Sequence, residues 1–172
     1  MGTNTAALLA GGYTTANVDV VETYDGSTWT EVADLNTARR DLSGSGTNTA
    51  AFMTGGNSTT HLAINEEWDG SSWTEIADLN TARKNVTGDG TTSSSIVVGG
   101  GASGYQALTE TWDGSSWTEN GDLNQARDTA TFQGLGTASA GFLAGGTSSR
   151  TPGVEGLTEE WTLGQNVEII TD

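Results

Sequence analysis

Carboxylates are the side chains of this sequence most able to do chemistry, because it holds 22 Asp and Glu residues against six Lys and Arg. Two carboxylates about 5 to 5.5 Å apart can cleave a glycosidic bond, one as acid and one as nucleophile. Most of these acids recur at fixed spacing: Glu22, Glu66, Glu110 and Glu159; Asp25, Asp69 and Asp113; Glu31, Glu75 and Glu119; Asp34, Asp78 and Asp122. A residue repeated in every unit is placed by the structure of that unit, whereas an active site needs one asymmetric set. We therefore interpret the repeated acids as structural and expect no catalytic residues.

Other catalytic and metal-binding chemistries lack the residues they need. The absence of Cys excludes disulfides, thiolate metal sites and a Cys nucleophile. The single histidine, His61, excludes a metal cluster built on His. We expect a protein that is not an enzyme and that holds no metal and no cofactor.

The charge balance limits the partners. A formal net charge of −16 would repel phosphate backbones and anionic membranes. The apolar run near the N-terminus is only about six residues long and follows no basic residues, so it suits neither a signal peptide nor a membrane helix. We expect a soluble protein with no nucleic-acid partner, no membrane insertion and no signal peptide.

The repeated acids belong to a unit of about 44 residues. Residues 5–12 are typical of a strand buried on both faces, and a glycine pair ends it. Residues 18–26 and 27–35 indicate two strands joined by a turn with Gly26 at positive φ, which places Tyr24 opposite Trp29. Residues 40–46 indicate a short glycine-rich fourth strand near an axis. Four strands in 44 residues match one propeller blade.

The glycine pair, an acid-aromatic-Asp-Gly stretch, a Trp five residues after that aromatic, and Leu-Asn-Thr-Ala-Arg together resemble the kelch repeat. The Thr- and Ala-rich sequence of the repeat is most similar to kelch-like repeats in proteins of marine phages and bacteria. The resemblance implies an all-β fold, a β-propeller of four-stranded kelch-like blades with about four repeats of 44 residues per chain. We expect one domain over residues 1–172, with repeats at about 2–45, 46–89, 90–135 and 136–172.

The expected strands do not fill four blades. The sequence indicates that the chain begins with the second strand of a blade, so the first blade would lack its innermost strand. The last strand, near residues 165–172, either closes the fourth blade or crosses to the first, and its short connection favours the fourth. We expect a homo-oligomer or a larger polypeptide to complete the ring.

Three sets of repeated residues are expected to hold the blades together. They are Trp29, Trp73 and Trp117; Arg39, Arg83 and Arg127; and Glu22, Glu66 and Glu110. One hypothesis is that a repeated Glu such as Glu66 pairs with a repeated Arg, either Arg83 or Arg39, between blades.

The repeats differ in the loops between the second and third strands of each unit, at residues 13–20, 57–64, 102–108 and 147–157. In a propeller these loops emerge on one face, and loops on a rigid scaffold often carry recognition. The candidate ligand-binding residues are Tyr13, His61, Tyr105 and Arg150. Drift in unconstrained loops is the alternative interpretation.

The function we expect is binding or structural. By resemblance, the chain fits a phage virion or tail protein, or a surface adhesion component, that presents these loops to a glycan or a protein. The alternatives are an intracellular scaffold for protein interactions and a glycan-processing hydrolase. A virion or extracellular surface is the location that the resemblance implies.

Overall fold

The computed structural model describes residues 1–128, 136–148, 158–162 and 168–170, and every regular element in these ranges is a β-strand. Four antiparallel sheets of four strands each follow one another along the chain. The expectation of an all-β protein built from four-stranded sheets is confirmed.

Each sheet is made by consecutive strands. Sheet 1 holds β1 (Gly2–Thr3), β2 (Ala6–Tyr13), β3 (Asn17–Tyr24) and β4 (Trp29–Glu31). Sheet 2 holds β5 (Ser43–Gly46), β6 (Ala51–Thr54), β7 (Asn65–Trp68) and β8 (Trp73–Ile76). Sheet 3 holds β9 (Thr87–Thr91), β10 (Ser94–Val98), β11 (Thr109–Trp112) and β12 (Trp117–Glu119). Sheet 4 holds β14 (Gly136–Thr137), β15 (Ala140–Ala144), β17 (Thr158–Thr162) and β18 (Glu168–Ile170), and a small ribbon pairs β13 (Arg127–Asp128) with β16 (Thr147–Ser148).

The first and last strands of the chain complete sheets 1 and 4. The prediction that the first sheet lacks its innermost strand was wrong, because Gly2 and Thr3 pair with Ala7 and Ala6 as β1. This strand is only two residues long and has no apolar pattern by which a sequence could indicate it. The prediction that the last strand closes the fourth sheet is confirmed, because β18 pairs with β17.

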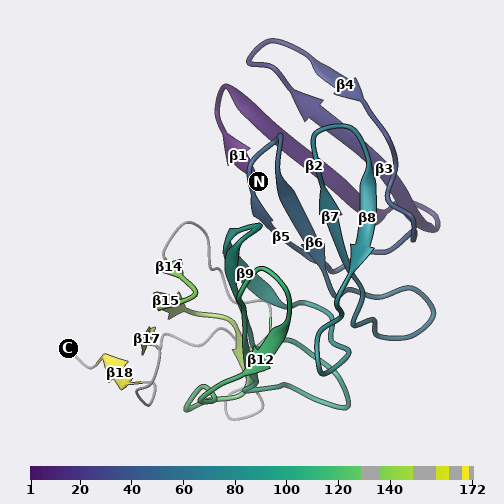
Figure 1. Cartoon of the computed structure of the whole chain (residues 1–172). Helices are drawn as coiled ribbons and strands as arrows, with labels where there is room; N and C mark the ends of the chain where they lie inside the picture. The colour runs from purple at the N-terminus through teal and green to yellow at the C-terminus, as the bar shows by residue number, and fades with distance from the viewer. Residues whose placement is uncertain (129–135, 149–157, 163–167, 171–172) are drawn as a thin grey trace.

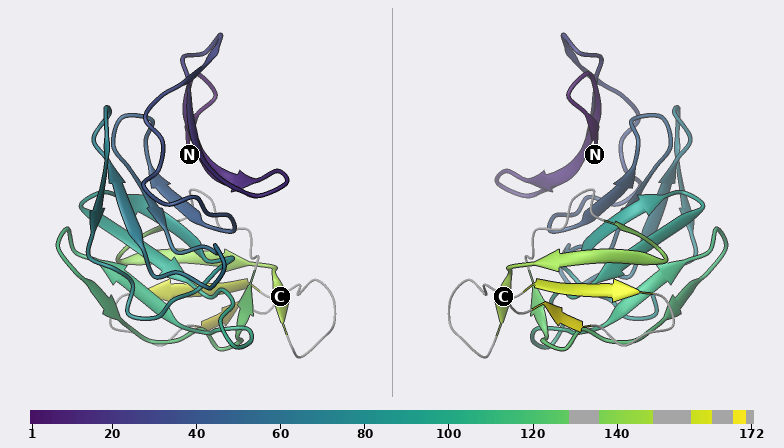
Figure 2. Two further views of the ribbon diagram at one scale, coloured as in Figure 1. Left: turned by 90° about the vertical axis from the view of Figure 1, so that its right-hand side faces the viewer. Right: turned by 90° about the vertical axis from the view of Figure 1, so that its left-hand side faces the viewer.

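The sheets are arranged along a curved path. The views in Figures 1 and 2 show sheet 1 at one end of an open arc and sheet 4 at the other. The first strands of successive sheets, β5, β9 and β14, contact one another. These are the glycine-rich strands that the sequence predicted near an axis, and Gly88 shows why they are small. A Cβ at this residue would lie 3.2 Å from the Ser43 hydroxyl of the neighbouring sheet.

Apolar side chains fill the spaces between consecutive sheets. We call the face of a sheet that is turned toward the next sheet its leading face, and the face turned toward the preceding sheet its trailing face. Equivalent leading-face residues are Leu8, Phe52, Ile96 and Phe142, and equivalent trailing-face residues are Leu9, Met53, Val97 and Leu143. Leu8 packs in one cluster with Met53, Phe52 with Val97, and Ile96 with Leu143. The core is therefore a series of sheet-to-sheet interfaces rather than one central cluster.

The prediction that residues 5–12 form a strand buried on both faces was wrong for the first repeat. All of β6 is buried, but in β2 Leu9 is 57% exposed while the equivalent Met53 is only 5% exposed. The reason is position, since no described sheet covers the trailing face of sheet 1.

The predicted aromatic pairs are confirmed. Tyr24 lies opposite Trp29, with ring centroids 5.1 Å apart. The equivalent pairs Trp68 with Trp73 and Trp112 with Trp117 have centroids 5.2 and 5.4 Å apart. The connecting turn has Gly26 at a φ of +97°, in the left-handed region that favours glycine.

Candidate functional site

The repeated arginines lie at the junctions between sheets. Arg39 follows sheet 1, and its Nη1 donates to Glu66 Oε1 of sheet 2, with both side chains fully buried. Its Nη2 also donates to the Met53 carbonyl at 2.9 Å. The second oxygen of Glu66 accepts from the backbone and side-chain amides of Asn36 at 2.7 and 2.8 Å. The sequence left two arginines as possible partners of Glu66, and the structure pairs Glu66 with Arg39 and not with Arg83.

The same arrangement recurs at the next junction. Arg83 Nη2 lies 2.6 Å from Glu110 Oε1, and Arg83 Nη1 donates to the Gly99 carbonyl at 2.7 Å. Asn80 donates to Glu110 Oε2 from its backbone and side chain at 2.8 and 2.9 Å. Burial lowers the pKa of the Arg83 guanidinium, and the charge of Glu110 opposes this shift.

A third copy joins sheets 3 and 4. Arg127 forms a buried ion pair with Glu159, and the Asn124 backbone donates to the other oxygen of this carboxylate at 2.7 Å. A buried charge is tolerated when it is paired and its remaining hydrogen-bonding capacity is filled. The three repeated arginines and their partners Glu66, Glu110 and Glu159 are therefore used inside the protein and are not available to a ligand.

Sheet 1 has the repeated Glu and Trp but not their partners. The Glu22 carboxylate is half-buried, and none of the described residues donates a hydrogen bond to it or forms an ion pair with it. Trp29 is 49% exposed, whereas Trp73 is 7% exposed and donates its indole N–H to the Ala33 carbonyl of the preceding repeat at 3.0 Å. The repeated Glu and Trp residues of sheets 2 and 3 thus lie inside junctions, whereas Glu22 and Trp29 of sheet 1 lie on a face that no described sheet covers.

The Asp-Gly turns are closed by their own acids. Asp69 Oδ1 accepts from the backbone amides of Ser71 and Ser72, both at 2.8 Å, and from the Ser71 hydroxyl at 2.8 Å. These bonds, led by the one from the Ser72 amide, lower the pKa of Asp69 to about 2. The equivalent bonds lower the pKa of Asp113 to about 2 and also lower that of Asp25. These carboxylates therefore stay ionised and hold a turn.

The first variable loop begins at Tyr13, the last residue of β2. The Arg40 guanidinium lies over its ring, 4.7 Å from the centroid, and Arg40 Nη1 donates to Asn17 Oδ1 at 2.9 Å. Because β2 runs to Tyr13 and β3 starts at Asn17, the predicted loop over 13–20 is shorter than expected. The stacked cation already occupies one face of the Tyr13 ring.

The next loops are tied to the residue that follows each repeated arginine. Arg40 and Asn57 exchange backbone hydrogen bonds at 3.0 and 2.7 Å, and Asn57 bridges to His61. Lys84 and Gly101 exchange equivalent bonds at 3.0 and 2.7 Å. Each loop is therefore fixed to the turn of the preceding repeat, which gives the loops a defined frame.

The third loop forms one side of an open pocket. Tyr105 bridges to Gly101 and lines a cavity of about 500 Å³. The residues that line it are Lys84, Gly101, Ala102, Gly104, Tyr105 and Asp128. The pocket combines one cation, one carboxylate, one aromatic ring and glycine backbone, which suits recognition of a polar ligand with an apolar face.

The structure does not gather all the predicted loop residues into one site. Tyr13, His61 and Tyr105 lie in three successive loops, and only Tyr105 lines this pocket. Arg150 falls outside the described residues. Lys84 and Asp128 were missed as candidates, although the sequence offers a signal, because the position after the repeated arginine is the variable series Arg40, Lys84 and Asp128.

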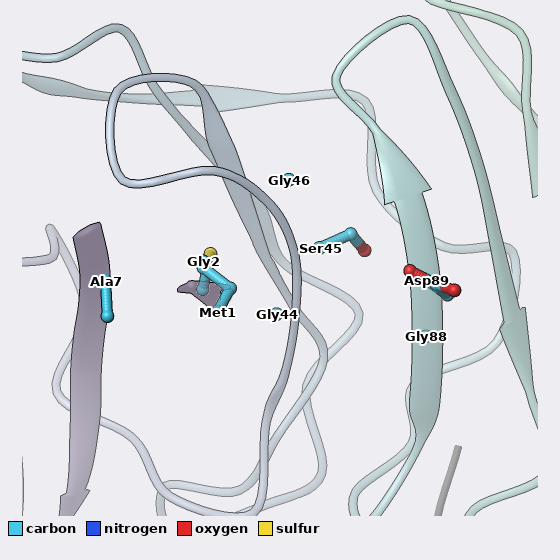
Figure 3. Close-up of a pocket in the computed structure, with 8 residues that line it drawn as sticks. All are labelled: Met1, Gly2, Ala7, Gly44, Ser45, Gly46, Gly88 and Asp89. Atoms are coloured by element: carbon cyan, nitrogen blue, oxygen red, sulfur yellow. The ribbon is translucent and has the colours of Figure 1, made fainter. Parts of the chain in front are cut away.

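A second cavity of about 450 Å³ lies between the first strands of the sheets (Figure 3). It is lined by Met1, Gly2, Ala7, Gly44, Ser45, Gly46, Gly88 and Asp89. Met1, Ser45 and Asp89 stand at one repeat position, 44 residues apart, so sheets 1 to 3 each present a different side chain to this cavity. Asp89 is the single carboxylate among the described lining residues, whereas hydrolysis by a carboxylate pair needs two.

Metal-binding clusters and membrane-spanning helices are both missing from the described ranges. Within residues 1–128, 136–148, 158–162 and 168–170, no group of three or more His, Asp and Glu residues is placed to hold a metal ion. The same part of the chain contains no helix with the length and apolar character needed to cross a membrane.

Known proteins resemble this chain in fold. No protein-family model and no curated protein matches it. A solved structure of a protein called YjhT is similar, with a TM-score of 0.73 and 14% sequence identity over 89% of this chain and 52% of that one. The chain thus spans about half the length of the structure it matches. The all-β chain of four-stranded antiparallel sheets is consistent with a β-propeller-like fold.

Proposed function

We propose that this chain is a non-enzymatic binding module, a β-propeller of kelch-like blades that presents its variable loops to a glycan or protein partner. The observation that carries the proposal is the pocket lined by Lys84, Tyr105 and Asp128. Its residues vary between repeats, while the repeated Arg side chains and the three Glu side chains that pair with them are used at the buried junctions. Recognition by variable loops on an invariant frame is the usual use of such an architecture.

The chemistry of the pocket favours a glycan or a polar peptide. A tyrosine ring offers an apolar surface against which a sugar or a side chain can pack, and its hydroxyl can form a hydrogen bond. Lys84 and Asp128 add one donor group and one acceptor group at the same rim. A phage virion or tail component, or a surface adhesion protein, would use such a site for attachment.

The proposal includes the continuation of the arc into a ring. A second copy of the chain or further polypeptide would supply the remaining blades, in keeping with the open ends and the half-length match.

A glycan array and a parallel pull-down of protein partners test the binding function. The purified chain should retain a ligand, and Tyr105→Ala should weaken that binding about tenfold or more, as loss of an aromatic anchor does. Thr118→Ala, at an exposed position of β12, is the matched control and should leave binding unchanged. Equal binding by both variants would remove the pocket from the proposal, and turnover of a glycan would overturn the non-enzymatic function.

A further inference from the structure

The trailing face of sheet 1 is built like the faces that are covered elsewhere. Leu9, Glu22 and Trp29 occupy the positions that Met53, Glu66 and Trp73 occupy in sheet 2. Met53 and Trp73 are almost fully buried against sheet 1, while Leu9 and Trp29 are about half exposed. Val20 adds a further apolar side chain that is 39% exposed on β3. Sheet 1 therefore carries an apolar interface with nothing from the described residues packed on it.

The charge on this face specifies what would cover it. At each of the three junctions, a repeat carboxylate accepts hydrogen bonds from an Asn and pairs with an Arg, and both donors come from the turn after the preceding sheet. Glu22 is the fourth carboxylate of this set and has neither donor among the described residues. Covering the face without supplying a cation would bury an unpaired charge, which is strongly unfavourable.

We propose that the trailing face of sheet 1 binds a further four-stranded sheet of the same repeat type, one that is followed by a Leu-Asn-x-x-Arg turn. The arginine of that turn pairs with Glu22, the asparagine fills the second carboxylate oxygen, and the incoming sheet covers Leu9 and Trp29. The inference takes from the proposed ring only the assumption that the added sheet precedes sheet 1 along the arc. It does not depend on which ligand binds at the loop pocket.

A second copy of residues 1–172 does not meet this requirement. The sequence has three Leu-Asn-x-x-Arg segments, and their arginines, Arg39, Arg83 and Arg127, all pair with carboxylates of this chain. The leading face of sheet 4, on which no described sheet packs, offers Phe142, which is 42% exposed, as an apolar contact. It would bring Glu22 no guanidinium from this set. The partner sheet therefore carries an arginine turn of its own.

An extended chain tests the inference directly. A second copy of residues 46–89 is fused to the amino end of the chain at Gly2, replacing Met1, so that the added arginine precedes Glu22 by the same 27 residues that separate Arg39 from Glu66. The matched control carries Arg83→Gln in the added copy only. The accessibility of Trp29 is read from acrylamide quenching, as the difference between each chain and its Trp29→Phe variant.

The added unit should reduce the quenching of Trp29 several-fold and raise the Tm by several degrees. The control with Arg83→Gln in the added copy should lose most of both effects, as should Glu22→Gln in the extended chain. Unchanged quenching in the extended chain, or equal protection by the control, would overturn the proposal.

Sedimentation of the original chain provides an independent measurement. A mass of 17.7 kDa supports the inference. A mass twice as large that is lost in Leu9→Asp would overturn it, because a second copy would then occupy the face. Neither outcome affects the glycan and pull-down measurements, so failure of this inference is distinguishable from failure of the proposed binding function.

Discussion

Arg39 and Glu66 are 27 residues apart in sequence and form a fully buried ion pair that joins sheet 1 to sheet 2. The guanidinium also reaches the Met53 carbonyl, and the carboxylate also accepts from Asn36. One interaction thus connects the turn after one sheet to two strands of the next. Since it recurs at all three junctions, the repeated acids and arginines act as the polar core of each interface.

Loss of one member of such a pair should destabilise the protein strongly. Arg83→Met leaves Glu110 buried without its cation, and we expect a loss of about 3–5 kcal/mol in the free energy of unfolding. The double variant Arg83→Met with Glu110→Leu should recover part of this loss, because no unpaired charge remains. Denaturant unfolding measures both. Arg40→Met, at a partly exposed position, is the control and should change stability by less than about 1 kcal/mol. A harmless Arg83→Met would contradict a structural role for the pair.

Gly55 should not tolerate a side chain. Its φ is +64°, and a Cβ would lie 2.7 Å from the Arg83 carbonyl oxygen, which is fixed by its hydrogen bond from the Gly56 amide. We expect Gly55→Ala to cost about 1–3 kcal/mol or more, from backbone strain together with the close contact. At Gly101 a Cβ would find no atom closer than 3.6 Å, so Gly101→Ala should be nearly neutral. Thermal unfolding of the two variants checks the contrast, and equal effects would show that the close approach does not matter.

The Asp-Gly turns should make stability depend on pH in the acid range. Because the folded-state pKa of Asp69 is lowered to about 2, from an ordinary value of about 3.9, its ionised form stabilises the fold above about pH 4. This contribution is lost as the pH falls through about 2. Asp69→Asn removes the titration, so the Tm difference between the original chain and this variant should be largest at neutral pH and shrink toward about pH 2. A difference that stays constant across this whole range would contradict the assignment.

The sequence alone could predict those features that depend only on spacing within a repeat. The pairing of Tyr24 with Trp29 follows from a four-residue turn. The glycine pairs mark the ends of β6, β10 and β15, whereas β2 runs through its pair to Tyr13, so there the prediction of a strand end was wrong. The partner of Glu66 was left open between Arg39 and Arg83, because within one repeat either arginine is available. Only the direction in which the sheets follow one another decides it.

The features that could not be predicted depend on position in the arc or on variable residues. Leu9 and Met53 are equivalent in sequence, yet Leu9 is exposed and Met53 is buried, because sheet 2, unlike sheet 1, has a described sheet on its trailing face. The pocket at Tyr105 was predicted only in part, since Lys84 and Asp128 come from two different turns. Lys84 reaches Gly101 through backbone pairing, whereas Asp128 lies against Gly101 with its side chain. Such convergence has no signature in a local pattern.

The tryptophans provide a test of this dependence on position. Trp73 is buried between sheets 1 and 2 and its indole N–H donates to Ala33, so Trp73→Ala should cost about 3–5 kcal/mol through the cavity it leaves and the hydrogen bond it removes. Trp29 occupies the same repeat position on the open face, and Trp29→Ala should cost much less because half of the side chain is already in water. Denaturant unfolding of the two variants gives the comparison.

In the chain extended by residues 46–89, Trp29→Ala should become as costly as Trp73→Ala, because the added sheet places Trp29 inside a junction. Equal losses for the two variants in the original chain would mean that Trp29 is already covered there, and the open face of sheet 1 would then have to be abandoned.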